Sequence, residues 1–208
     1  MTEIIISGPP QSSYVRTARM IAVEKGLDYQ LAPIDFKSPA HLARHPWGRV
    51  PLLKHGDVEL IETAAIAHYL DAIGPGPALV PTPARARAEN EQWISVINCY
   101  AYGDLVTNYL FHYLFPKTDD KRPDRALIER DLPAMARDLR LFEAGFRGAW
   151  LTGPTLALAD LFLAPILAYV SMFPEAQAVL ETTPNLRRFL GAISARPSFT
   201  ASAPPRPA

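Results

Sequence analysis

The chain has 208 residues, of which 49% are hydrophobic and 20% charged, and its 21 basic residues equal its 21 acidic ones. This length suits two small domains, and the composition is ordinary for a soluble globular protein. The neutral charge balance, without a basic stripe, argues against a nucleic-acid partner. The single cysteine, Cys99, excludes an internal disulfide and a Cys-x-x-Cys redox or zinc motif.

The sequence carries no targeting or membrane-spanning signal. The segment Met1–Ile6 lacks the basic start and the small-residue cleavage site of a signal peptide. No apolar run reaches the roughly 18 residues that a membrane helix needs. We therefore expect a cytoplasmic protein without a membrane partner.

The beginning of the chain predicts a β-α-β unit. Ile4–Ile6 is a β-branched run closed by the breaker cluster Gly8–Pro10, which indicates a buried strand. Apolar residues then recur at helical spacing, and Ser12 and Ser13 can cap that helix. Residues 29–34 predict a second strand, so parallel pairing with a right-handed crossover is favoured.

The next segment completes an α/β domain. Residues 41–45 predict a short helix, residues 52–53 and 58–61 a hairpin, and residues 62–72 a helix. The order β-α-β-α-β-β-α describes a mixed four-stranded sheet with flanking helices. We place this domain at residues 1–74, because the cluster Gly74–Pro77 is the clearest breaker in the chain.

The rest of the chain, residues 84–200, lacks strand alternation and predicts an all-helical domain. Four helices are expected, the first of which could bend near Gly103. Their ranges are 85–115, 125–146, 156–172 and 184–195. The third is the most apolar, so we expect it to be the central buried helix.

Val50-Pro51 places a proline at the start of a predicted strand. A cis bond there would leave the backbone N–H and C=O of Val50 free to pair with an extended, peptide-like ligand. The alternative is a trans proline at a loop end, because only about 5–6% of X–Pro bonds are cis.

Two helix starts also suit a ligand. The backbone N–H groups at Glu62-Thr63 suit a carboxylate, while Glu62 can accept from an ammonium group. The Ser12 hydroxyl can donate to a sulfur anion at the first turn of its helix. Lowering a thiol pKa by two units takes roughly 2.7 kcal/mol. The alternative at both positions is a helix cap without a ligand.

Four segments, in their order and spacing, resemble the N-terminal domain of the soluble glutathione transferases, closest to the serine-type, phi-like and related bacterial members. The segments are Gly8–Arg16, Glu24–Leu27, Lys37–Pro51 and Leu60–Ile66. The resemblance extends over essentially the whole chain and is most specific as far as about residue 72. It implies a thioredoxin-like first domain, a helical second domain, a homodimer and a cis bond before Pro51.

The resemblance implies a role for each matching residue. Ser12 matches the catalytic serine that stabilises the thiolate, although Ser13 and Tyr14 are neighbouring hydroxyls. Val50, before Pro51, matches the residue whose backbone holds the cysteinyl part of glutathione. The pair Glu62 and Thr63 matches the residues that hold the γ-glutamyl group, with threonine in place of the commoner serine. Lys37 and Arg49 match positions that reach the glycyl carboxylate.

Two departures from the family pattern stand out. Phe36 stands where phi-like members often have a histidine that contacts the glycyl end. Ala157 begins a segment that resembles the family's buried helix start, where a serine or threonine usually caps. Alanine cannot cap with its side chain, so we expect Asp160 to accept backbone N–H bonds there in a structural role.

The resemblance places the electrophile site between the first helix and the long helices of the second domain. Aromatic side chains at helical spacing fit the wall of an apolar pocket, although such residues are commonly core. The candidates are Tyr14, Tyr102, Tyr109, His112 and Tyr113.

The resulting hypothesis is an enzyme that ionises the glutathione thiol for attack on a small hydrophobic electrophile. Glutathione is a cosubstrate, and no metal or prosthetic group is implied. One alternative is a non-catalytic protein that binds glutathione or another ligand. Another is a glutathione-dependent peroxidase or disulfide reductase.

Overall fold

The structure is a computed structural model that describes residues 3–205. The first two residues of the predicted α/β domain lie outside the described residues. The chain divides into two compact units, and each is considered by itself. The first unit contains residues 3–80 together with 194–205, and the second contains residues 81–193.

The first unit contains the mixed four-stranded sheet that the sequence predicts. Its strands are β1 (Ile4–Ser7), β2 (Gln30–Ala32), β3 (Leu52–His55) and β4 (Val58–Leu60), in the order β2-β1-β3-β4. The pair β1 and β2 is parallel, whereas β1 with β3 and β3 with β4 are antiparallel. The antiparallel pairing of β1 with β3 places the carboxyl end of β1, at Ser7, beside the amino end of β3, at Leu52.

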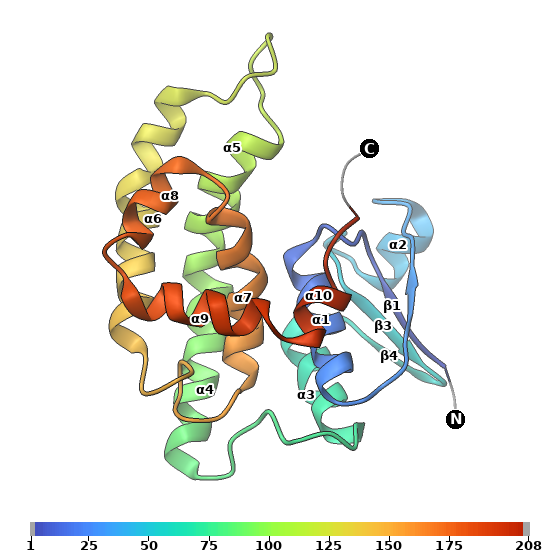
Figure 1. The fold of residues 1–208 in the computed structure, drawn as a ribbon. Coiled ribbons are helices and arrows are strands. Elements are labelled where there is room, and N and C mark those ends of the chain that lie inside the picture. Colours follow the sequence, from blue (N-terminus) through green and yellow to red (C-terminus); the bar gives the residue numbers. More distant parts are fainter. Residues whose placement is uncertain (1–2, 206–208) are drawn as a thin grey trace. The chain divides into compact units, whose positions relative to one another are not determined.

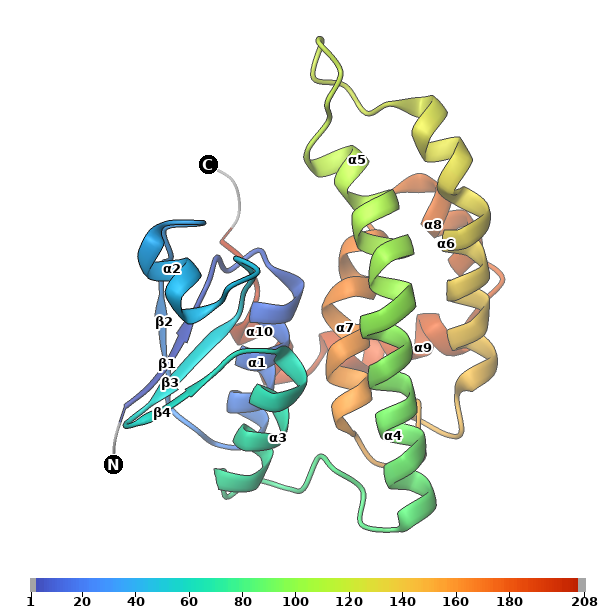
Figure 2. The same cartoon turned by 180° about the vertical axis from the view of Figure 1, so that it is seen from behind.

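Four helices belong to the same unit. They are α1 (Ser13–Glu24), α2 (Pro39–Arg44), α3 (Thr63–Ile73) and α10 (Pro197–Ala201). The helices α1 and α3 pack against each other beside the sheet, and α2 lies apart from that pair (Figures 1 and 2). Fully buried Ile6, Ile21, Leu53 and Ile66 join strands and helices in one apolar core.

Two buried arginines on α1 make hydrogen bonds to backbone carbonyls in and just after α10. Arg16 Nη2 donates to the Phe199 carbonyl at 3.1 Å, and Arg19 Nη1 donates to the Ser202 carbonyl at 2.9 Å. Carbonyl groups at the end of a helix favour such cations. These contacts group the chain from Ser194 onward with the first unit, whereas the sequence prediction extended the helical domain to residue 200. Partners more than 180 positions apart leave no local pattern in the sequence.

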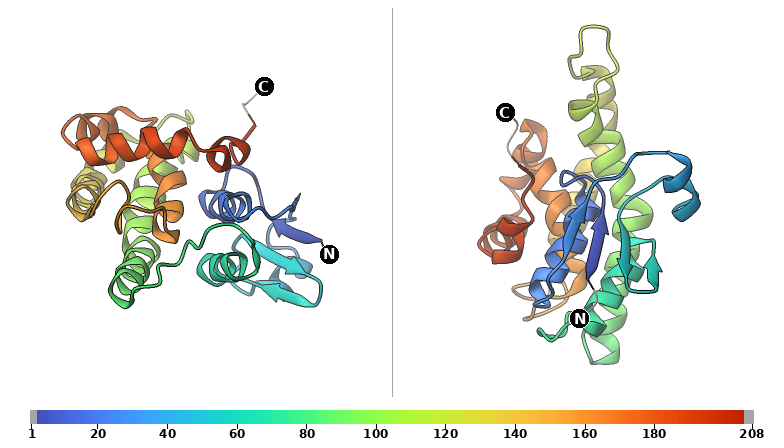
Figure 3. Two further views of the ribbon diagram at one scale, coloured as in Figure 1. Left: turned by 60° about the horizontal axis from the view of Figure 1, so that its bottom comes forward. Right: turned by 90° about the vertical axis from the view of Figure 1, so that its right-hand side faces the viewer.

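The second unit is all-helical. Its helices are α4 (Ala84–Val96), η1 (Ile97–Leu110), α5 (Phe111–Leu114), α6 (Arg125–Gly145), α7 (Leu158–Val170), α8 (Pro174–Leu180) and α9 (Pro184–Ser194). The rod formed by α4, η1 and α5 runs beside α6 and α7 (Figures 2 and 3). As predicted, α7 is the most buried helix, with eleven buried residues. No helix among residues 3–205 is long and apolar enough to cross a membrane.

The middle of the long rod is π-helical, a feature that the sequence did not reveal. The Phe111 N–H donates to the carbonyl of Val106, five residues earlier, as π-helical geometry requires. This widened stretch includes Gly103, near which the sequence allowed a bend. It packs against both α6 and α7.

Candidate functional site

The turn from β1 into α1 carries Ser12. Ser12 is the N-cap of α1, is partly exposed, and its Oγ accepts from the Val15 N–H at 3.4 Å. This cap bond is long for an N–H···O contact. It also occupies Oγ only as an acceptor, so the hydroxyl proton can still be donated to an anion. Ser13 is buried, and Tyr14 is partly exposed.

Gly8 brings this turn against the Val50 segment. Its φ is +147°, and a Cβ added there would lie 2.5 Å from Val15 Cγ2 and 3.1 Å from Val50 Cβ. A side chain at Gly8 therefore cannot fit without moving its neighbours, so glycine lets the two segments touch. The same glycine donates its N–H to the Ala32 carbonyl at 3.0 Å, which keeps the turn on the end of β2.

The Val50-Pro51 bond is cis, as the resemblance implied. Val50 is partly exposed and lies two residues before the start of β3. Within residues 3–205, neither its N–H nor its C=O has a hydrogen-bond partner. A free donor and acceptor on one extended residue can pair with the backbone of a peptide-like ligand, as a neighbouring strand would.

The start of α3 is conformationally unusual. Glu62 is its N-cap, with φ +70° and an exposed side chain that makes no cap hydrogen bond. Such a backbone conformation costs a non-glycine residue about 1–3 kcal/mol and is concentrated at functional sites. Thr63 follows and is 6% exposed. Burial lowers the pKa of the neighbouring His45 imidazole, against the opposing effect of the Glu62 carboxylate.

Lys37 and Arg49 lie on the two segments that flank α2, and both side chains are exposed. Lys37 has φ +61°. The ring of His41 connects the two segments through its nitrogen atoms. The structure therefore links the positions for which the resemblance implies contact with a glycyl carboxylate.

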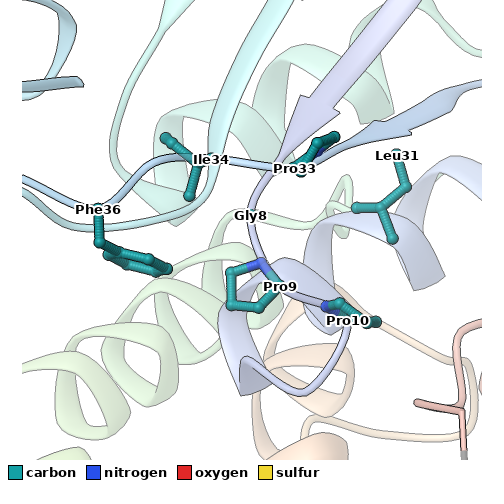
Figure 4. Close-up of a pocket in the computed structure, with 7 residues that line it drawn as sticks. All are labelled: Gly8, Pro9, Pro10, Leu31, Pro33, Ile34 and Phe36. Atoms are coloured by element: carbon teal, nitrogen blue, oxygen red, sulfur yellow. The ribbon is translucent and has the colours of Figure 1, made fainter. Parts of the chain in front are cut away.

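An apolar hollow of about 380 Å³ lies beside the Ser12 turn (Figure 4). Pro9 and Pro10 line it from the turn after β1, and Ile34 and Phe36 from the segment after β2. The other lining residues are Gly8, Leu31 and Pro33. Sequence reasoning noted Phe36 only as a departure from the family pattern and missed its place in this hollow. In the sequence, the breaker cluster Gly8–Pro10 was the feature that could have indicated this hollow, because all three residues line it.

The aromatic candidates of the second unit do not share one environment. Tyr109 is fully buried, and its hydroxyl donates to Glu175 Oε2 at 2.9 Å. Tyr102, His112 and Tyr113 are partly exposed. The burial of Tyr109 gives it a place in the helical core, which differs from the pocket wall that the sequence predicts.

A polar network around Glu175 on α8 was also not predicted from the sequence. Glu175 accepts from the hydroxyls of Tyr109 and Tyr113 and from Arg125 Nη2 at 2.6 Å. Burial alone would raise the pKa of Glu175, but the bonds from Tyr113 and Arg125 lower it to about 2. The Tyr113 hydroxyl donates to Glu175 at 2.7 Å and accepts from Arg125 Nη1 at 2.9 Å. Its proton is therefore committed to the network.

His112 also has a carboxylate partner. Its Nε2 lies 3.1 Å from Asp131 Oδ2, and Asp131 forms a second pair with Arg130 Nε at 2.8 Å. This arrangement joins α5 to α6 and supports a packing role. No group of histidine, cysteine, aspartate or glutamate side chains in the described part of the chain could hold a metal ion.

The arrangement defines a class of protein. A thioredoxin-like α/β unit, with a cis-proline loop facing the first helix start, precedes an all-helical unit. Residues 7–72 match the glutathione S-transferase N-terminal domain, and residues 104–197 match the glutathione S-transferase C-terminal domain.

Similar proteins cover most or all of the chain. Glutathione S-transferase 3 of Zea mays is 31% identical over 217 residues, which cover 100% of this chain and 97% of the relative. Glutathione S-transferase F11 of Arabidopsis thaliana is 31% identical over 188 residues, with coverage of 85% and 86%. A solved maize glutathione S-transferase I, in complex with an atrazine glutathione conjugate, has a TM-score of 0.84 and 28% identity over 96% of each chain. The chain belongs to the glutathione S-transferase family.

Proposed function

We propose that this protein is a glutathione transferase that ionises the thiol of glutathione and transfers the thiolate to a hydrophobic electrophile. The observation that carries the proposal is the contact between the Ser12 turn and the Val50 segment across Gly8. Gly8, in the turn that leads into Ser12, thus lies against Val50, a residue with a free backbone donor and acceptor. A small ligand that contains both a sulfur atom and a peptide backbone matches the Ser12 hydroxyl and the Val50 backbone groups.

Ser12 is the residue proposed to stabilise the thiolate. Its hydroxyl proton is not used by the cap bond to Val15, and the N-terminal end of α1 adds a favourable dipole. A charge-assisted hydrogen bond and the dipole together are of the size needed to lower a thiol pKa by about two units. The proton released from the thiol goes to solvent, and the thiolate sulfur forms a bond to the electrophilic carbon. With an aryl halide, the carbon–halogen bond then breaks and the halide leaves with its electron pair.

The rest of the tripeptide is assigned from the family resemblance, and the charges and positions of the residues support that assignment. Val50 pairs with the cysteinyl backbone next to Pro51. The α3 start at Glu62 and Thr63 takes the γ-glutamyl group, because it offers a carboxylate and helix N–H donors together. Lys37 and Arg49, both exposed cations, take the glycyl carboxylate.

The hollow beside the Ser12 turn supports an apolar acceptor. Its lining contains no ionisable side chain, so a charged group placed there would lose hydration without a partner. Tyr14 of the first unit is a further proposed contact because it is partly exposed. The family resemblance makes Tyr102 of the second unit, also partly exposed, a proposed contact. His112 and Tyr113 are left out of this proposal because Asp131 and Glu175 hold them. Tyr109 is left out of this proposal because it is fully buried.

We further expect a cytoplasmic homodimer that needs no cofactor besides its cosubstrate. Calorimetric titration with glutathione and a conjugation assay with an activated aryl halide test the function. Micromolar to millimolar binding together with turnover is expected. Binding without turnover, including with peroxide and disulfide substrates, would instead indicate a ligand-binding protein. A lack of glutathione binding would overturn the proposal.

A further inference from the structure

His41 lies outside every role assigned so far, yet both of its ring nitrogens are used. It belongs to α2 and is 3% exposed. The Lys37 N–H donates to His41 Nδ1 at 3.1 Å. Nδ1 therefore acts as the acceptor, and in a neutral imidazole the proton lies on Nε2. Nε2 then donates to the Arg49 carbonyl at 2.9 Å.

The bond from His41 Nε2 to the Arg49 carbonyl holds the Arg49-Val50 peptide group, which also contains the Val50 N–H. The Arg49-Val50 bond is not among the cis bonds of the described chain, so its C=O and N–H point in opposite directions. A ring that holds the carbonyl on the α2 side directs the Val50 N–H away from α2. Hydrogen bonding to the carbonyl also polarises the amide and strengthens its N–H as a donor.

The bond from the Lys37 N–H to His41 Nδ1 holds the turn that carries the Lys37 side chain. Lys37 has φ +61°, a conformation that a non-glycine residue keeps only when its surroundings support it. Its N–H is held by the His41 ring, and Ser38 Oγ accepts from the His41 N–H at 3.2 Å. One imidazole therefore connects the Lys37 turn to the Arg49-Val50 peptide.

Packing fixes the orientation of the ring. The Phe36 ring lies edge-on at 5.7 Å between centroids, and the His45 ring lies edge-on at 6.3 Å. Aromatic pairs at such separations favour an edge-to-face arrangement. The ring is thus held between neighbours while its two nitrogens face two different backbone groups.

We propose that His41 is a positioning residue for glutathione: it orients the Val50 N–H and holds the Lys37 turn for the ligand. This inference rests on the proposed function, because Val50 and Lys37 are contacts of glutathione only within it. His41 touches neither the sulfur nor the acceptor in this scheme. Its loss should therefore weaken glutathione binding without changing the ionisation of the bound thiol.

Two amide substitutions separate the two ring bonds. In His41→Gln, the amide nitrogen can reach the place of Nε2, which keeps the donor to Arg49. In His41→Asn, the amide oxygen can take the place of Nδ1, but no donor reaches Arg49. We expect His41→Asn to raise the KM and Kd for glutathione about tenfold. The Gln variant should stay within about threefold of wild type, because the carbonyl bond is the one it retains.

The turnover number and the thiol pKa, read from thiolate absorbance against pH, should be unchanged in both variants at saturating glutathione. The matched control is His55→Asn, since His55 lies at the far end of β3 and its Nδ1 bonds to the Tyr69 hydroxyl at 2.8 Å. Thermal unfolding of all three variants gives the folded fraction by which each constant is corrected.

Equal losses in His41→Asn and His41→Gln would overturn the inference, because ring shape and not the Arg49 bond would then matter. An unchanged KM in His41→Asn would overturn it as well. In either case, glutathione binding by the wild-type protein would leave the proposed function intact. Failure of the wild type to bind glutathione would overturn both.

Discussion

The starts of α1 and α7 show two ways of treating the free N–H groups of a helix. At α1, Ser12 supplies a local cap, with a long 3.4 Å bond and a partly exposed hydroxyl. At α7, the cap position is Ala157, which has no side-chain acceptor. Buried Asn90 on α4 instead accepts from the Ala159 N–H at 2.9 Å.

Asp160 completes the buried start of α7. Its Oδ1 accepts from the Leu151 N–H and its Oδ2 from the Ala157 N–H, both at 2.8 Å. The backbone N–H groups at the start of α7 thus make short hydrogen bonds inside the core. At the start of α1, the Ser12 hydroxyl makes only a long bond and is partly exposed. The comparison teaches that a weakly satisfied, exposed helix start keeps a donor available for a ligand, whereas the bonds of a tightly satisfied, buried one contribute to stability.

The largest expected effect comes from Ser12→Ala. If its hydroxyl stabilises the thiolate, the thiol pKa should rise by about two units and conjugation near neutral pH should fall about a hundredfold. The pH–rate profile should move upward by the same amount. Loss of the cap should cost only about 1 kcal/mol of stability. Ser13→Ala, at a buried neighbour, is the control; a normal pKa in Ser12→Ala would remove Ser12 from the mechanism.

Asp160→Asn should give the next largest effect, on stability instead of chemistry. An amide cannot accept both N–H bonds, so one buried donor is left unpaired, at about 1–3 kcal/mol. Urea unfolding measures this loss. Glutathione affinity per folded molecule should not change, and a changed affinity would contradict the division between the two helix starts.

The same residue predicts a pH dependence. Burial raises the pKa of Asp160 to about 7, against the two backbone N–H bonds that lower it. Between the unfolded pKa near 4 and about 7, the folded state holds more protons than the unfolded one. The contribution of Asp160 to stability therefore falls as pH rises through that window. Unfolding free energies at several pH values should show this slope in wild type and lose it in Asp160→Asn.

Asn90→Ala should destabilise the second unit by about 2 kcal/mol, because the Ala159 N–H would be buried without an acceptor. Chemical denaturation followed by tryptophan fluorescence is suitable, since Trp93 lies on the same helix as Asn90. The nearby substitution Gln92→Ala, at an exposed position two residues from Asn90, is the control. A loss no larger than that of the control would mean that solvent or Asp160 already satisfies this helix start.

The smallest expected effect is a gain. Ala157 has φ −130° and ψ 170°, an extended conformation typical of an N-cap. A serine there could accept from a backbone N–H of the first turn, so Ala157→Ser in the Asn90→Ala background should recover about 1 kcal/mol. The double-mutant cycle measures the coupling. Purely additive effects would show that the two caps do not substitute for each other.

Much of the first unit follows from local patterns. The β-branched run at Ile4, the breakers at Gly8 and the Ser12 cap predict a strand, a turn and a helix in the observed order. The expected sheet is confirmed, and so is the cis bond before Pro51. That bond followed from the resemblance, because the dipeptide alone favours trans. The roles of the site residues remain predictions.

The second unit was less predictable. The long rod, α6, α7 and α9 were expected, but α8 was missed because its seven residues give too short a periodic pattern. The widened η1 stretch, which packs against α6 and α7, was not predicted. The aromatic residues were given one shared role, whereas Tyr109 is core and Tyr113 is bound to Glu175.

By itself, the sequence determined the order of the strands and of the longer helices, the breakers, the local caps and the spacing of the motif residues, since these depend on neighbours within a few positions. Only the tertiary structure decided which distant groups meet. Asn90 reaches Ala159 across 69 positions, and Arg19 reaches Ser202 across 183. Burial removes water as a partner, so each polar group in the core must find another one, and the fold chooses which.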